Sequence, residues 1–130
     1  MQVVINKVDE PWVEFSCPLG KGIGLGIGYN KFTDFEVNEE LDIELDIEPL
    51  LDLGTNTSYS DDLYPFIDFD EDHLYINAIA ESVDELNYVV LRLSEDCVIM
   101  TEASSNEIVA GDYLHIKLER SALLINIDGY

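Results

Sequence analysis

Apolar and polar residues alternate along most of this chain, and this period of two limits its fold more than any other feature. In the clearest run, from Leu41 to Glu48, apolar residues hold every odd position and acidic residues every even one. Successive side chains of a β-strand point to opposite faces, so the run predicts a half-buried strand. The same pattern predicts short strands at residues 3–6, 12–16, 23–29, 35–47, 66–69, 74–80, 88–93, 98–101, 113–118 and 123–127.

Turn-forming residues separate these segments, for example Asp9-Glu10-Pro11 and Gly111-Asp112. Strands of this length and spacing are typical of an antiparallel β-sandwich or a small β-barrel. With 130 residues, 47% of them hydrophobic, the chain suits a single domain, residues 1–130. Ser82 and Glu85 have the spacing of a helix capping box. The expected class is therefore all-β, or β-rich α+β with one short helix.

Alternate positions from Gly20 to Gly28 are glycines. Their spacing meets neither the G-x-G-x-x-G fingerprint nor a P-loop, so it does not support nucleotide binding. In a strand, one face of this segment carries no side chains, which permits sharp bending or the close approach of another backbone. A flexible loop that contacts a partner is the alternative.

The chain is strongly acidic, with 28 Asp and Glu against 6 Lys and Arg and a net charge of −22. Self-repulsion of this size opposes compaction, so the excess calls for a basic partner, adaptation to high salt, or a need for solubility. Direct contact with nucleic acid or an anionic membrane is disfavoured, because both require a basic patch. The start lacks a cationic leader, and no segment approaches the ~20 apolar residues that cross a bilayer. A cytoplasmic location is therefore expected.

The acidic residues gather most densely between positions 36 and 48. A strand over residues 35–47 would place its carboxylates on one face, about 6.8 Å apart and with no interleaved lysine. Such a row suits electrostatic steering of a cationic protein and charge-assisted hydrogen bonds to its Arg or Lys side chains. The alternative is a solvated face that blunts edge pairing. The candidate partner-binding residues of this row are Glu36, Glu40, Asp42, Glu44, Asp46 and Glu48.

A second acidic cluster, Asp68, Asp70 and Asp72, resembles the opening of a calcium loop. The rest of that pattern fails, because His73 stands where the sharp turn needs glycine and Ile79 where a bidentate Glu is needed. The cluster is interpreted as a hairpin turn that extends the anionic surface, and no metal site is predicted. Its three aspartates complete the set of candidate partner-binding residues.

Few residues suit catalysis. His73 and His115 are the only imidazoles, and neither lies in a nucleophile or metal-ligand motif. Cys17 and Cys97 stand 80 positions apart in apolar contexts, where reduced thiols are commoner than a disulfide. No enzymatic activity and no cofactor is expected.

In size, acidity and β-rich patterning, with its acidic row from Glu36 to Glu48, the chain resembles the small acidic immunity proteins of bacterial toxin and contact-dependent growth inhibition systems. The resemblance implies tight binding and neutralisation of a cognate toxin domain, often a cationic nuclease. It carries no shared motif, so it assigns no residue. Two alternatives stay open: a DNA-mimic inhibitor of nucleic-acid-binding proteins, and an acidic cytosolic structural or binding domain without a toxin partner.

Overall fold

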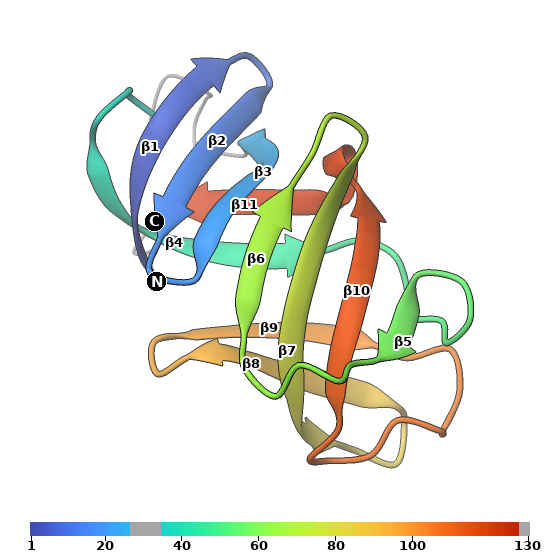
Figure 1. Cartoon of the computed structure of the whole chain (residues 1–130). Coiled ribbons are helices and arrows are strands. Elements are labelled where there is room, and N and C mark those ends of the chain that lie inside the picture. Colours follow the sequence, from blue (N-terminus) through green and yellow to red (C-terminus); the bar gives the residue numbers. More distant parts are fainter. Residues whose placement is uncertain (27–34, 128–130) are drawn as a thin grey trace.

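The computed structural model describes residues 1–26 and 35–127, and strands dominate them (Figure 1). All ten predicted segments correspond to strands, which confirms the all-β prediction; residues 27–29 of one segment lie outside the described part. The strand β5 was not predicted, and a 3₁₀ turn, η2 (Arg120–Ala122), precedes the last strand. The strands are β1 (Gln2–Asp9), β2 (Trp12–Cys17), β3 (Gly20–Gly26), β4 (Glu40–Ile47), β5 (Thr57–Tyr59), β6 (Phe66–Phe69), β7 (His73–Val83), β8 (Tyr88–Ser94), β9 (Cys97–Glu102), β10 (Tyr113–Glu119) and β11 (Leu123–Ile127).

Five strands close a barrel. β1, β2 and β3 pair in antiparallel order, and β4 returns to the other side of β1, which gives the Greek-key order β4-β1-β2-β3. β11 then pairs antiparallel with β4 and parallel with β3, where Leu124 lies opposite Leu25. This last pairing closes the ring, so a small barrel is formed rather than a sandwich.

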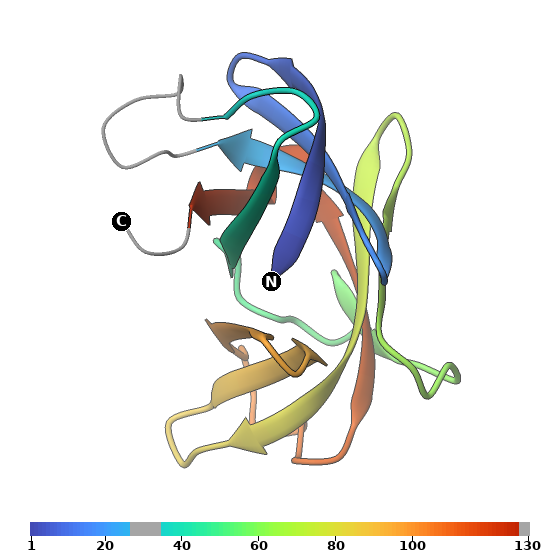
Figure 2. The same ribbon diagram turned by 90° about the vertical axis from the view of Figure 1, so that its left-hand side faces the viewer.

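The strands between β4 and β11 in the sequence extend the sheet outside the barrel. β6 joins β3 at one parallel pair, Gly20 opposite Ile67, and the sheet continues through β7 and β10 to β5. The register of β7 shifts between Ala80 and Ser82, and its second half pairs with β8, which pairs with β9. Figures 1 and 2 show β8 and β9 at the far end of the molecule from the β1–β2 hairpin. There, β9 lies beside β4.

One hydrophobic cluster fills the barrel and continues under the outer strands. Most strands contribute alternate residues to it, as the period of two predicts, whereas β5 contributes none. On β4 the buried members are Ile43, Leu45 and Ile47, and on β9 they are Cys97 and Ile99. Burial of the apolar face therefore fixes which face of β4 carries its carboxylates to solvent.

The glycines of β3 lie where other chain segments approach closely. A Cβ on Gly22 would overlap the Phe15 ring, and one on Gly24 would overlap the backbone carbonyl of Leu123. These two contacts confirm the expectation of close approach and show that β11 can lie against β3 only because the side chain is missing.

Two local predictions were wrong. The strand predicted from Phe35 begins only at Glu40, because Asn38 adopts a positive φ of 69° in a turn and leaves Val37 52% exposed. The helical turn at Ser82–Glu85 does not form either. β7 continues to Val83, and the carboxylate of Asp84 accepts hydrogen bonds from the N–H groups of Leu86 and Tyr88, both at 2.9 Å, which closes a hairpin instead.

Candidate protein-binding face

The outward face of β4 carries a row of carboxylates. Glu40, Asp42, Glu44 and Asp46 are exposed and alternate with residues that point inward, and Glu48 continues the row just past the strand. Glu36 is also exposed, but it lies before the turn at Asn38 and so outside the row. From here on, the acidic row means Glu40, Asp42, Glu44, Asp46 and Glu48.

The strands on either side of the row supply no cation to it. On β1, Val4 lies opposite Glu40 and Gln2 opposite Asp42. On β11, Leu124 lies opposite Asp46. The three ion pairs formed between described residues join Met1 to Asp96, Lys7 to Glu14 and Arg92 to Glu81. Asp42, Asp46 and Glu48 therefore retain negative charge that no ion pair within the described residues offsets.

Exposed apolar side chains lie next to the acidic row, on β8, on β9 and in the segment after β4. Val98 is 38% exposed, Met100 71%, Tyr88 51% and Leu50 48%. These four residues form what we call the apolar strip. Val90 lies opposite Met100 in the β8–β9 pairing, so the apolar surface continues onto β8. An exposed apolar cluster rimmed by charge is typical of a protein-binding surface.

A shallow depression joins the strip to the row. Its volume is about 430 Å³, and Glu48, Leu50, Tyr88, Met100 and Glu102 are among the residues that line it. The negative charge of Glu102, together with a hydrogen bond to its carboxylate, raises the pKa of the Tyr88 hydroxyl. The Tyr88 hydroxyl is therefore engaged by Glu102, and its exposed ring contributes apolar area beside the carboxylates.

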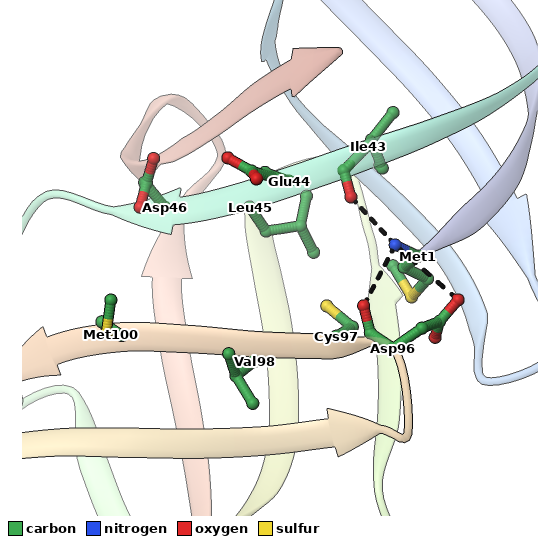
Figure 3. Close-up of a pocket in the computed structure, with 9 residues that line it drawn as sticks. All are labelled: Met1, Ile43, Glu44, Leu45, Asp46, Asp96, Cys97, Val98 and Met100. Carbon is green, nitrogen blue, oxygen red and sulfur yellow. Dashed lines mark hydrogen bonds and ion pairs between the residues drawn. The ribbon is translucent and has the colours of Figure 1, made fainter. Parts of the chain in front are cut away.

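A second cavity, of about 220 Å³, lies between β4 and β9 (Figure 3). At one end, the α-amino group of Met1 donates to the carbonyl oxygens of Ile43 at 3.1 Å and Asp96 at 3.3 Å. The Asp96 carboxylate accepts a 2.6 Å hydrogen bond from Ser94 and lies 3.8 Å from the amine. The Ser94 hydrogen bond, and then the charge of the amine, lower the pKa of Asp96. We call this cavity the β4–β9 cleft; Met100 lines both it and the depression.

The second predicted acidic cluster occupies the β6–β7 hairpin. Asp70 accepts hydrogen bonds from the N–H groups of Asp72 at 2.9 Å and His73 at 2.8 Å. Asp68 accepts one from the N–H of Phe69 at 2.9 Å. β11 and β3 lie between β4 and β6 in the sheet, so the structure does not join these three aspartates to the acidic row. The carboxylate of Asp70 therefore stabilises the hairpin turn.

The two imidazoles lie on β7 and β10, whereas the Cys97 thiol lines the β4–β9 cleft together with Glu44 and Asp46. His115 stacks on Tyr75 with ring centroids 5.9 Å apart, and His73 lies 6.4 Å from the same ring. Both cysteines are free thiols, and burial raises the pKa of Cys97 to about 11. Across residues 1–26 and 35–127, no group of three or more His, Cys, Asp or Glu side chains is placed to hold a metal ion.

The apolar strip and the cleft were missed by sequence reasoning. A signal for the strip was present, because the segment Cys97-Val98-Ile99-Met100 is apolar on both faces and so must expose apolar side chains on one of them. No local signal placed β9 beside β4. In the described residues, no helix has the length and apolar character needed to cross a membrane.

No protein-family model, curated protein or solved structure matches the chain. Function is therefore argued from the acidic row, the apolar strip and the cleft.

Proposed function

We propose that this protein binds a basic protein partner through the acidic row and the apolar strip, and that it acts as a bacterial cytoplasmic immunity protein that neutralises a cationic toxin domain such as a nuclease. One observation supports this above the others. Asp42 and Asp46 stand on a strand flanked by neutral residues at Gln2 and Leu124, so the row attracts cations from outside the chain.

The charge distribution favours fast association. A row of like charges raises the local concentration of a cationic partner and increases the association rate, an effect that salt screens over about 8 Å at physiological ionic strength. A nuclease surface that attracts phosphate also attracts carboxylates. Charge alone increases the association rate more than it increases the affinity. The exposed Met100 and Tyr88 add apolar area beside the row, and burial of this area on binding would raise the affinity.

A DNA-mimic inhibitor is the alternative function. Carboxylates two residues apart on one strand stand about 6.8 Å apart, which is twice the 3.4 Å rise per phosphate on one DNA strand. The second acidic cluster belongs to a separate part of the sheet. One row beside an apolar strip favours a single partner with both basic and apolar contacts over the many partners of a phosphate mimic.

The gene neighbourhood and a co-expression experiment test the proposal. We expect the adjoining reading frame to encode a secreted protein with a toxic C-terminal domain, and co-expression of this chain to restore growth. The variant E40Q/D42N/D46N/E48Q should protect less well at equal expression. A matched control neutralises four exposed acids outside the face, E10Q/D61N/E71Q/E85Q, and should protect fully.

Three results would contradict the proposal. One is the absence of a toxic domain in the adjoining frames, and another is equal loss of protection in both variants. The third is tight binding of several unrelated nucleic-acid-binding proteins in place of the adjoining toxin, which would favour the DNA mimic.

A further inference from the structure

Backbone groups on one edge of β4 point into the β4–β9 cleft. The N–H of Ile43 donates to the carbonyl of Met1 at 2.8 Å, and the carbonyl of Ile43 accepts from the Met1 amine. Backbone groups of every second residue in a strand point to the same side. The N–H and C=O groups of Leu45 and Ile47 therefore point the same way as those of Ile43, beyond the end of β1.

The facing edge of β9 is arranged in the same manner. The carbonyl of Glu102 accepts a hydrogen bond from the N–H of Leu51 at 2.8 Å, on the side of β9 away from β8. By the same alternation, the backbone groups of Val98 and Met100 point to that side. At the other end of β9, the carbonyl of Asp96 accepts from the Met1 amine. The carbonyl groups at both ends of this edge thus accept hydrogen bonds, and both hydrogen bonds lie on the side of β9 that faces β4.

Between these two ends the cleft holds unpaired backbone. Within the described part of the chain, β4 pairs only with β1 and β11, β9 pairs only with β8, and no ladder of backbone hydrogen bonds joins β4 to β9. Figure 3 shows Met1, at the start of β1, lying between the two strands at one end of the gap. β1 therefore lies against β4 at that end, and alongside Leu45 and Ile47 the edges of β4 and β9 face each other without pairing.

We propose that an extended segment of the basic partner enters the β4–β9 cleft as an added strand, in line with β1, and pairs with the backbones of both β4 and β9. This inference rests on the proposed function, because it takes the partner to be basic. Strand addition of this kind derives affinity from main-chain hydrogen bonds and specificity from alternate side chains. To admit a strand, β4 and β9 must move until they stand about 9.6 Å apart, twice the spacing of paired strands.

The surroundings of the cleft define the side chains that the segment carries. On the outside, Asp46 on β4 and Asp96 at the start of β9 line the cleft, so they favour Lys or Arg on the outward positions of the added strand. On the inside, Leu45 and Cys97 are buried. These residues favour apolar, β-branched side chains on the inward positions. The segment is therefore expected to alternate basic and apolar residues.

A second copy of this chain is a poor occupant. Each copy carries a net charge of −22, so an edge-to-edge dimer would place two acidic surfaces together. Self-association is nevertheless measurable by sedimentation at the protein concentration of the binding experiment. A dimer whose formation slows exchange at the cleft amides would overturn the choice of a basic partner.

Hydrogen-exchange NMR with a defined peptide tests the proposal. The probe is a blocked hexapeptide that alternates lysine and valine. In the free protein, we expect the amides of Leu45, Ile47, Val98 and Met100 to exchange at least about tenfold faster than those of Glu48 and Ala103, which donate to Ala122 and Asn87. Saturating peptide should slow the four cleft amides by about tenfold and leave the other two unchanged.

Two control peptides separate backbone pairing from charge attraction. The same peptide N-methylated at every residue keeps every charge but loses the backbone donors on both of its edges, and it should not slow exchange at any of the four amides. A peptide that alternates glutamate and valine keeps the donors but reverses the charge, and it should not bind. Strand addition is overturned if the four cleft amides are already protected in the free protein, or if the N-methylated peptide protects them equally. Equal protection by the glutamate peptide overturns the basic occupant.

The same measurement on the complex with the adjoining toxin domain distinguishes the two proposals. If the toxin is neutralised through the acidic row while exchange at the cleft amides is unchanged, strand addition fails and the proposed function stands. If the lysine peptide protects the cleft but no adjoining frame encodes a toxic domain, the proposed function fails and the cleft remains a strand-accepting site.

Discussion

The Tyr75 hydroxyl donates a 2.8 Å hydrogen bond to the Asp70 carboxylate, which also accepts two backbone N–H groups in the β6–β7 hairpin. The two backbone hydrogen bonds, and then that from Tyr75, lower the pKa of Asp70 from 3.8 to about 2. A lowered folded-state pKa stabilises the folded state above the unfolded value and loses this contribution as pH falls through the folded value.

The hairpin should therefore weaken as pH falls from 3.8 towards 2. We expect D70N to lower the melting temperature at pH 7 and to reduce the loss of stability between pH 4 and pH 2. Urea unfolding across this pH range measures the stability of the wild type and of D70N. D68N removes a neighbouring carboxylate of the same hairpin and serves as the control. A pH profile of D70N that parallels the wild-type profile would remove Asp70 from the acid response.

Replacement of Gly24 should strain the closure of the barrel. In G24A the new Cβ overlaps the carbonyl of Leu123, so β3 and β11 must separate, and we expect a loss of about 2–3 kcal/mol in the free energy of unfolding. In G54A no atom lies within 4 Å of the new Cβ, but φ is +89°, so only a conformational cost of about 1 kcal/mol is expected. Equal losses in the two variants would show that the contact with Leu123 does not limit the barrel.

Neutralisation of the acidic row should change the kinetics of association more than those of dissociation. For E40Q/D42N/D46N/E48Q, we expect the association rate with the toxin to fall about tenfold or more at low salt, and its dependence on salt to flatten. Stopped-flow binding between 20 and 300 mM salt measures both quantities. The control E10Q/D61N/E71Q/E85Q carries the same net charge as the row variant. If it slows association equally, overall charge and not the row steers the partner.

Met100 should contribute to binding but not to folding. Its side chain is 71% exposed between the cleft and the depression, so M100S should change the free energy of unfolding by less than about 0.5 kcal/mol. We expect the same variant to weaken partner binding by about 1 kcal/mol or more, mainly through faster dissociation. V109S, at an apolar position 56% exposed in a loop, is the control for nonspecific effects. Unchanged affinity in M100S would remove the apolar strip from the interface.

The thiol of Cys97 should be unreactive in the folded protein. With a pKa of about 11, about one molecule in a thousand carries the thiolate at pH 8, and the thiolate is the nucleophile. We expect iodoacetamide to modify Cys97 only after denaturation, as mass spectrometry of native and urea-unfolded samples would show. Rapid modification of the native protein would show that the cleft opens to solvent at this residue.

The alternation of residue types determined most of the local structure. Polar and apolar side chains must separate to opposite faces of a strand, so Leu41 to Glu48 specified both a strand and the direction of its carboxylates before any tertiary contact was known. The pattern failed at Asn38, where a single positive φ turned the chain and separated Glu36 from the acidic row.

Only the tertiary structure decided which strands are neighbours. Local periodicity carries no information on the partner of a strand edge, because pairing depends on contacts between segments far apart in the chain. Leu51 meets Ala103, β11 closes the barrel against β3, and β9 comes to lie beside β4. The acidic row could therefore be read from the sequence. The apolar strip beside it and the unpaired cleft exist only because long-range packing of one shared core brings β4 and β9 together without pairing their edges.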